Sequence, residues 1–168
     1  MSASVFFIDE SCLREAVAAV LAKATARMHA LIPGAIVEHV GATAVPGSLT
    51  RPDVDIQVRV PQGRHAEADA LLALHFGRDM RTRGSTTFSS FLDASASPVL
   101  GIQLTSIGGP EDLHHRMRDF LVAHPSANAA FNDLKRRHEG GDIDEYTRDK
   151  SQFLDALQEV VIETGFGL

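Results

Sequence analysis

The sequence predicts one domain of the mixed α/β (α+β) class, in which a sheet core precedes a helical C-terminal part. Apolar residues recur at helical spacing near both ends of the chain and alternate with polar residues in its middle. No repeat, low-complexity stretch or polar linker divides the 168 residues. A chain of this length buries about 70% of its unfolded surface as one unit. We therefore expect a single domain over residues 1–168.

The first predicted element is an N-terminal helix over residues 9–32, "DESCLREAVAAVLAKATARMHALI". Asp9 or Ser11 can cap its start, because their side-chain oxygens accept hydrogen bonds from free backbone N–H groups. Pro33 and Gly34 stop it. Apolar side chains recur along it at helical spacing: Leu13, Val17, Val20 and Leu21.

The sheet core is expected over about residues 35–107. "AIVEHV" is typical of a short strand, and a loop rich in glycine and proline follows it. "DVDIQVRV" at 53–60 alternates strictly, so its apolar residues share one face while Asp53, Asp55, Gln57 and Arg59 share the other. "RHAEADALLALHF" predicts a helix. Residues from about 78 to 107 predict two or three further strands, among them "TTFSSFLDA" and "VLGIQLTSI".

The helical tail is expected over about residues 110–165, in three pieces broken near His124-Pro125 and Gly140-Gly141. Its last helix carries a common stripe of side chains: Tyr146, Lys150, Phe153, Leu154, Leu157 and Val161. The tail follows the sheet core with no clear domain boundary.

Composition narrows the function classes. The net charge of −6 argues against a broad nucleic-acid-binding surface. The single cysteine, Cys12, excludes an internal disulfide and fits a reducing cytosol. The first residues have no basic leader, and no stretch approaches the roughly 20 apolar residues of a membrane span. We therefore expect a cytoplasmic protein with no membrane partner.

Two acidic residues, Asp53 and Asp55, stand one apart at the head of the alternating strand. Side chains at i and i+2 of a strand lie about 6–7 Å apart. At that distance two negative charges repel by roughly 2.5 kcal/mol at an effective dielectric constant near 20. A divalent cation removes this cost, and Mg²⁺ binds one or two carboxylates together with substrate phosphates. The alternative is a solvated strand end, where screening reduces the repulsion to well under about 1 kcal/mol.

The loop before this strand, "GATAVPGS", is suited to holding a phosphate. Glycine at Gly41 lets backbone N–H groups approach an anion closely, next to the small residue Ala42. Thr43 and Ser48 could add hydroxyl donors. The alternative is a plain turn before a strand. A phosphate cradle beside a metal platform is, however, the arrangement that phosphate transfer requires.

Several separated motifs resemble the GrpB family. "EHVGATAVPGSLTRPDVDI" resembles the family signature of a histidine, Gly-Ser-Thr-x-x-Pro-Gly and Lys-Pro-x-x-Asp-Ile. "LHHRMRDFLVAHPSANAAFNDLKRRH" is similar to its Phe-Arg-Asp-Tyr-Leu-Arg-x-His-Pro run and the Tyr-x-x-Leu-Lys that follows. "YTRDKSQFL" is similar to its final Tyr-Thr-x-x-Lys-x-x-Phe-Ile helix. The resemblance extends from about Glu38 to Leu154.

The resemblance implies the nucleotidyltransferase superfamily, with its DNA polymerase β-like fold: a mixed sheet flanked by helices. That superfamily combines a Gly-Ser turn, an Asp-x-Asp strand and a third carboxylate on a later strand, and two metal ions position a nucleoside triphosphate for attack by an acceptor. By this resemblance Asp53 and Asp55 are the catalytic and Mg²⁺-binding residues. The backbone of Gly41, Ala42 and Thr43 cradles the phosphates. Arg51 and Lys150 are candidates to offset the phosphate charge.

The chain departs from the family pattern at several positions. Ala42 replaces the turn serine, and Arg51 replaces a lysine. The family's His-x-His strand appears as Ile102-Gln103-Leu104-Thr105, with no acid or imidazole. Asp93, in "FLDAS", is the nearest candidate for a third metal ligand, although its position also suits a turn.

The leading functional prediction is Mg²⁺-dependent binding of a nucleoside triphosphate, with possible nucleotidyl transfer to an acceptor that the sequence does not identify. One alternative is a non-catalytic module that binds a nucleotide or a phosphorylated metabolite such as a coenzyme A precursor. Another is an interaction protein without a ligand. The missing turn serine and third carboxylate favour the alternatives.

Other polar residues could serve the same site or have structural roles. Arg116 and Arg118 could reach a triphosphate or form ion pairs on a helix surface. The basic run at residues 135–137 predicts a solvated face. The histidines lack the partners and the spacing of a zinc site, and Cys12 has no evident histidine partner for nucleophilic chemistry.

Overall fold

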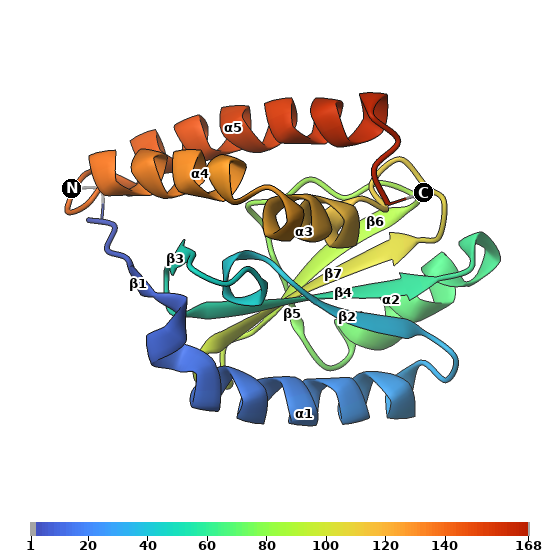
Figure 1. Cartoon of the computed structure of the whole chain (residues 1–168). Helices are drawn as coiled ribbons and strands as arrows, with labels where there is room; N and C mark the ends of the chain where they lie inside the picture. Colours follow the sequence, from blue (N-terminus) through green and yellow to red (C-terminus); the bar gives the residue numbers. More distant parts are fainter. Residues whose placement is uncertain (1–2, 168) are drawn as a thin grey trace.

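The computed structural model describes residues 3–167 and has three layers (Figure 1). The middle layer is a five-stranded sheet of order β2-β4-β7-β6-β5. One face is covered by α1 and α2, and the other by α3, α4 and α5. The strands are β2 (Ile36–Val40), β4 (Asp53–Val60), β5 (Gly77–Arg78), β6 (Phe88–Asp93) and β7 (Val99–Ser106). The helices are α1 (Arg14–Leu31), α2 (His65–Ala73), α3 (His114–Ala123), α4 (Pro125–Arg137) and α5 (Ile143–Glu163).

The pairing of β4 fixes the geometry of the sheet. It is antiparallel to β2 on one side and parallel to β7 on the other, and Asp55 is paired with Val40 and Gly101. β6 is antiparallel to both β7 and β5. The central strands thus bring residues 53–55, the end of β2 and the start of β7 to one end of the sheet.

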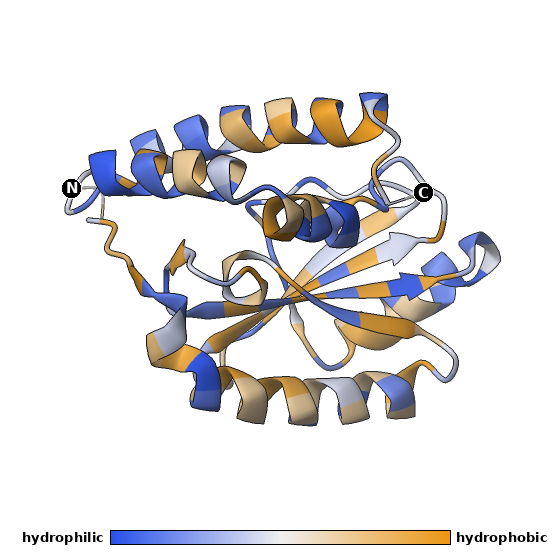
Figure 2. Cartoon of the chain, in the orientation of Figure 1, coloured by the Kyte–Doolittle hydropathy of each residue, from blue (hydrophilic) through white to orange (hydrophobic). Residues whose placement is uncertain are grey.

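The face toward α1 and α2 is the main hydrophobic core. The alternation predicted for residues 53–60 is confirmed, because Val54 is 0% and Ile56 is 1% exposed. They pack against apolar residues of both helices and of β6 and β7, including Val20, Met28, Leu72, Phe91 and Ile102. Figure 2 shows the hydrophobic residues gathered on the facing sides of these layers. Fully burying one such side chain contributes about 1.5–3 kcal/mol, so this core is the main source of stability.

The opposite face is polar near the middle of the sheet. Gln57 is fully buried and donates to Thr105 Oγ1 and Asp112 Oδ1 at 2.9 and 3.0 Å. Arg59 bonds both oxygens of Asp112, at 2.7 and 2.8 Å. The backbone N–H of His115, at the start of α3, donates to Gln57 Oε1 at 2.9 Å. These buried groups are satisfied by one another, and they fix α3 above the sheet.

The predicted elements are present, with changes at their ends. The N-terminal helix begins as a 3₁₀ turn (Glu10–Leu13) capped by Asp9, and α1 follows it. The breaks near His124-Pro125 and Gly140-Gly141 separate α3, α4 and α5 as expected. The sequence did not indicate a small second sheet, in which β1 (Ile8–Asp9) pairs with β3 (Leu49–Thr50). None of the helices within residues 3–167 combines the length and the apolar character needed to cross a membrane.

Candidate functional site

A cavity of about 350 Å³ lies between the polar face of the sheet and helices α3–α5. The turn after β2 and the ends of β4 and β7 form one wall, and side chains of the three helices form the other. All but one of the residues predicted for the site line this cavity: Gly41, Ala42, Ser48, Arg51, Asp53, Asp55 and Lys150. Thr43 is the exception.

Asp53 and Asp55 share the cavity-facing side of β4, and both are partly exposed. Burial raises the pKa of both carboxyl groups, and the charge of Asp55 raises the pKa of Asp53 further. The charges of Lys150 and Arg51 act in the opposite direction but do not reverse the shift. Among the described residues, neither carboxylate forms an ion pair within 4.0 Å. Two uncompensated acids therefore face the cavity.

Two glycines form the seat of the Asp55 carboxylate. Gly41 has a φ of +76°, and a Cβ there would lie 2.7 Å from Asp55 Oδ2. Gly101 is the partner of Asp55 across the parallel strands, and a Cβ there would overlap Asp55 Oδ1. The side chain of Gln103, also on β7, hydrogen-bonds the same carboxylate, which lowers its pKa. A side chain at either glycine would displace Asp55.

The helical wall contributes Lys135, which the sequence analysis placed on a solvated face. That prediction is wrong, because Lys135 is only 2% exposed. Its Nζ donates to Leu49 O at 2.6 Å and lies 3.9 Å from the centroid of the Phe131 ring. Burial and the nearby charge of Lys150 lower the pKa of Lys135 to about 7. The same wall includes Tyr146, which is 3% exposed and whose pKa is raised by burial.

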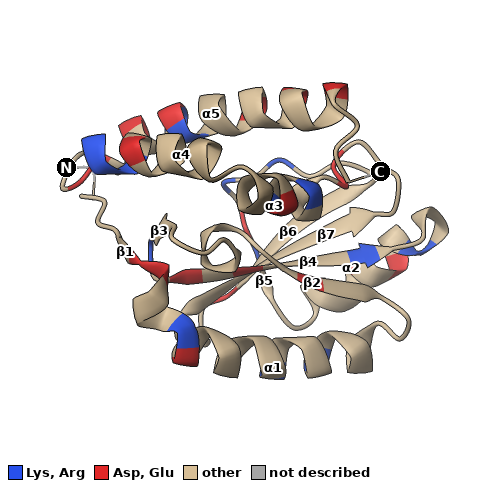
Figure 3. Ribbon diagram, viewed as in Figure 1, with Lys and Arg blue, Asp and Glu red and all other residues tan. Residues whose placement is uncertain are grey.

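Arg51 and Lys150 complete a group of three cations in this cavity with Lys135. Within residues 3–167, no ion pair with a carboxylate is found for any of the three. Figure 3 shows acidic residues along the first part of β4 and basic residues on α4 and α5 above it. Unpaired charges of both signs therefore face one cavity.

The two predicted hydroxyl donors are already engaged. Thr43 Oγ1 lies 2.8 Å from His39 Nε2, and both residues line a different recess beside α1. Ser48 lines the main cavity, but it is 1% exposed and its Oγ donates to Asn128 Oδ1 at 2.9 Å. Neither hydroxyl is therefore free for a ligand, and the backbone N–H groups of residues 44, 45, 47 and 48 are also bonded within the protein.

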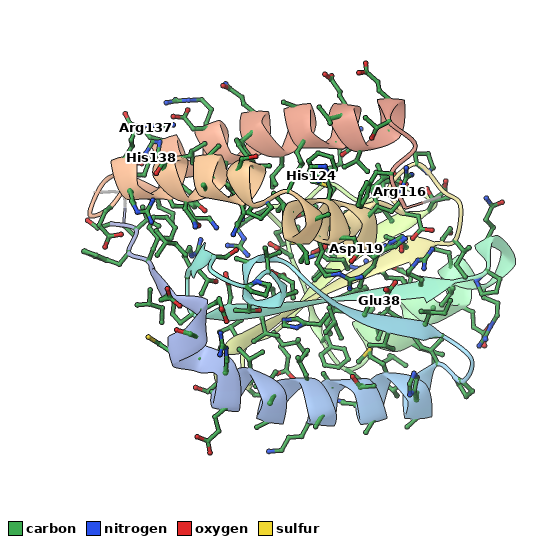
Figure 4. The ribbon with its side chains drawn as sticks, viewed as in Figure 1. Glu38, Arg116, Asp119, His124, Arg137 and His138 are labelled. Carbon is green, nitrogen blue, oxygen red and sulfur yellow. The ribbon has the colours of Figure 1, made fainter. Side chains whose placement is uncertain are left out.

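Arg118 lines the cavity, yet its guanidinium group is held by the protein. It donates to His39 O at 2.7 Å, to Asp119 at 2.8 Å and to Glu38 at 3.3 Å. Glu38 on β2 and Asp119 on α3 are labelled on either side of this junction in Figure 4. Arg116 donates to the backbone oxygens of Phe166 and Val161 and is not among the cavity-lining residues. The ion-pair alternative thus holds for Arg118.

Asp93 lies away from the carboxylate pair. It lines a recess against α1, on the other face of the sheet, and lies 3.5 Å from Arg27. It also accepts a hydrogen bond from the backbone of Ser95, as a turn residue does. Asp93 is therefore not placed to be a third ligand.

One of the histidines in the helical tail, His138, pairs with Asp149 at 2.9 Å.

A polar stripe of α4 holds the segment that connects the turn to β4, and the sequence analysis missed it. Asn128, Asn132 and Lys135 follow one helix face, and the two asparagines are each 6% exposed. Asn132 accepts from Leu49 N and donates to Gly47 O, both at 2.8 Å. Polar residues at this helical spacing, next to Phe131, were the available signal. We call residues 128, 132 and 135 the α4 clasp.

The opposite end of the cavity is aromatic. Phe88 stacks on His114 with ring centroids 5.9 Å apart, and both line the cavity. Phe88 is paired with Thr105, four residues beyond Gly101 on β7. This places it roughly 13 Å along the strand from Asp55. The cavity thus has a charged end and an aromatic end.

The donor set can be tested against the metal that the fold implies. Two carboxylates on one strand, with phosphate oxygens from a ligand, suit a single Mg²⁺ ion. No group of three or more His, Cys, Asp or Glu side chains within the described chain could hold a metal. Gln103 presents an amide to Asp55 where a further acid could stand. The residues therefore fit one ion shared with a ligand and do not fit two.

Comparisons with known proteins agree with this architecture. A model of the family described as "GrpB protein" matches residues 13–159. A UPF0157 protein of Vibrio cholerae is 28% identical over 128 residues, which cover 76% of this chain and 68% of that protein. The crystal structure of the conserved protein GrpB from Enterococcus faecalis has a TM-score of 0.69 at 18% identity, covering 89% of this chain and 93% of that one.

More distant similarity reaches a polymerase. A structure of the Cid1 poly(U) polymerase with MgGTP bound has a TM-score of 0.52 at 11% identity. The match covers 76% of this chain and 42% of Cid1. At these identities the two structural likenesses establish a shared fold.

Proposed function

The chain belongs to the GrpB family and has a nucleotidyltransferase-like fold, and we propose that it binds a nucleoside triphosphate together with Mg²⁺ in the cavity above β4. One observation carries the proposal. Two carboxylates without cation partners and three cations without carboxylate partners face the same cavity among the described residues. A ligand that is itself a cation bound to a polyanion would satisfy both groups.

Two energetic costs of the ligand-free fold would be relieved by such a ligand. Two like charges at the spacing of Asp53 and Asp55 repel by roughly 2.5 kcal/mol at an effective dielectric constant near 20. The buried ammonium group of Lys135 also loses hydration. Because no ion pair among the described residues offsets either cost, binding a metal–phosphate ligand recovers both.

Each wall then has a role. Asp53 and Asp55 hold the metal ion, and the backbone after Gly41 approaches the phosphates. Arg51, Lys135 and Lys150 offset the phosphate charge. When bound, Mg²⁺ would supply Lewis-acid polarisation of the phosphoryl group. Nucleotidyl transfer is the finer proposal, and the Cid1 polymerase of similar fold, with MgGTP bound, supports it.

A second candidate function is binding without transfer. The observation that favours it is Gln103, whose amide hydrogen-bonds Asp55. The resemblance to the superfamily implies a third carboxylate on a later strand, and here an amide is found next to Asp55 instead. In this reading the ligand is a nucleotide or another phosphorylated metabolite, such as a coenzyme A precursor. The two candidates share the site and differ in whether product forms.

Thermal unfolding with a panel of ligands tests the proposal. We expect one or more nucleoside triphosphates to raise the melting temperature with Mg²⁺, and much less without it. Ligand at 100 times its dissociation constant adds about 2.7 kcal/mol to the free energy of unfolding. Inorganic triphosphate and phosphopantetheine separate nucleotide from other phosphate ligands.

Matched variants locate the response. Asp55→Asn should lose it, because an amide is a weaker ligand for a hard cation than a carboxylate. Asp155→Asn, on the exposed side of α5, should keep it. If none of these phosphates stabilises the protein, the alternative of an interaction protein without a ligand is favoured.

A further inference from the structure

We propose that Lys135 is itself an acceptor: its ε-amine attacks the α-phosphorus of the bound nucleoside triphosphate, so that the protein becomes nucleotidylated on this side chain. The inference rests on the proposed function and names the chemical class of the acceptor as an amine. It assigns a covalent modification site in the α4 clasp, in the cavity that the carboxylate pair also lines.

The placement of Lys135 is unusual among the lysines of this chain. The sequence contains three, at positions 23, 135 and 150. Lys23 is exposed on α1, and Lys150 is partly exposed on α5. Lys135 is 2% exposed, lines the cavity that holds Asp53 and Asp55, and lies against the face of Phe131. An amine desolvated next to another cation is a recognised way to activate a lysine nucleophile.

The contacts of Lys135 leave its reactive electron pair available. The nitrogen makes one hydrogen bond, which it donates to Leu49 O at 2.6 Å. No carboxylate lies within 4.0 Å of it among the residues the structure describes. In the neutral amine, the bond to Leu49 O uses one N–H and orients the group. The electron pair then remains for an electrophile in the cavity.

An amine also removes a difficulty that a hydroxyl acceptor would meet. A hydroxyl must lose its proton to a base as it attacks. Among the residues that the structure describes, only the carboxylates of Asp53 and Asp55 line the cavity, and the proposed function assigns both to the metal. His114 lies at the aromatic end, near Phe88. Burial and the charge of Lys150 lower the pKa of Lys135 to about 7, so a large share of this amine needs no base at neutral pH.

The step balances without another reactant. The electron pair of Lys135 Nζ forms a bond to the α-phosphorus, and the bond from that phosphorus to the bridging oxygen of pyrophosphate breaks. Pyrophosphate leaves with the electron pair of the broken bond. The nitrogen releases one proton to water. The products are a phosphoramidate on Lys135, pyrophosphate and a proton.

Mass spectrometry tests the inference directly. The protein is incubated with each nucleoside triphosphate and Mg²⁺ at about pH 8, roughly one unit above the pKa of the amine. We expect the intact mass to rise by one nucleotidyl group, and the peptide that contains Lys135 to carry it. The adduct should be lost in mild acid and persist in base, as a phosphorus–nitrogen bond requires.

Two conservative variants sharpen the result. Lys135→Arg removes the nucleophilic amine, so it should form no adduct, whatever its affinity for triphosphate. Lys23→Arg changes the exposed lysine on the far side of the sheet and should leave adduct formation as in the unmodified protein.

A metal-free probe tests the reactivity of the amine separately. Pyridoxal 5′-phosphate carries both an aldehyde and a phosphate, and borohydride fixes its imine on lysine. Lys135 should be labelled with a midpoint near pH 7, far below the value of about 10.4 for a lysine amine in a model peptide. Labelling of Lys135 only near that higher pH would overturn the assignment of an activated amine.

The outcomes separate the two proposals. Thermal stabilisation by a triphosphate without any adduct on Lys135 overturns this inference and leaves nucleotide binding in place. The absence of both overturns the two together. An adduct on Lys150, or one that persists in Lys135→Arg, also overturns the assignment.

Discussion

Gly101 and Asp55 lie opposite each other across β4 and β7, and this contact yields a prediction for a single residue. A Cβ at position 101 would overlap Asp55 Oδ1, so Gly101→Ala must move the carboxylate. Overpacking of this kind costs about 1–3 kcal/mol. We expect the variant to fold with reduced stability and to lose most of the stabilisation by Mg²⁺ and triphosphate, as measured by thermal unfolding.

Gly77→Ala is the matched control, because a Cβ at Gly77 of β5 would lie 3.8 Å from its nearest neighbour, Leu92 O. That variant should keep its ligand response. If Gly101→Ala responded to ligand like the parent, Asp55 would not be held in place for a metal.

Sequence reasoning found the acids of the site more readily than its bases. Asp53 and Asp55 were predicted to share a face because alternation in a strand is a local property, and the structure brings them to one cavity with Gly41. Lys135 stands in a run of three basic residues, where local pattern favours a solvated face. Its burial depends on the backbone of Leu49, which is far away in the sequence.

At the scale of elements, the α4 clasp connects the helical tail to the turn of the site. Asn132→Leu would leave Leu49 N and Gly47 O without their partners. Each backbone group left without its partner costs about 1–3 kcal/mol, so for the two groups we expect a loss of roughly 2–6 kcal/mol in the free energy of urea unfolding. Ala129→Leu, on the exposed side of α4, controls for the added leucine and should change stability by less than about 0.5 kcal/mol. A loss below about 1 kcal/mol for Asn132→Leu would show that water satisfies Leu49 N and Gly47 O in place of the Asn132 side chain.

The elements that sequence predicted best are those with a period of their own. β4 has the bounds Asp53–Val60 that its alternation indicated, and α5 buries Tyr146, Leu157 and Val161 of the predicted stripe. β1 and β3 each have two residues, which are too few to show a period. They form because each strand pairs with the other, a contact between residues far apart in the sequence. The segment before β4, which the sequence predicts to be a loop, therefore contains the short strand β3.

At the scale of the whole molecule, acids on the same side of the sheet have opposite effects on stability. Burial raises the pKa of Asp112, but hydrogen bonds from Arg59 and from Gly108 N–H outweigh burial and lower it. Asp112 therefore stabilises the fold above its unfolded pKa, and this contribution is lost as the pH falls through the folded value. The charges that join α3 to the sheet favour neutral pH. Asp53 and Asp55 have the opposite effect, because their pKa values are raised and their charged forms destabilise the ligand-free fold as the pH rises.

The pH dependence of Asp55→Asn tests this division. The pKa of Asp55 is raised above 3.8 by burial, so the acid stabilises the ligand-free fold below that pH and loses this contribution as the pH rises through its folded pKa. Removing the charge should therefore make the variant progressively more stable than the parent between about pH 4 and pH 7. The gain arises mainly because the variant no longer buries the charge of Asp55, which is the largest cause of the raised pKa.

Urea unfolding of the two ligand-free proteins across this range measures the difference in the free energy of unfolding. Burial also lowers the pKa of several histidines (His39, His114 and His115), which changes stability in the same window, but this effect is common to both proteins and cancels in the difference. Asp155→Asn controls for the change in net charge and should show no such trend. A variant that became less stable than the parent toward pH 7 would mean that the Asp55 carboxylate stabilises the fold through its hydrogen bond to Gln103. The carboxylate would then not be a destabilising group retained for ligand binding.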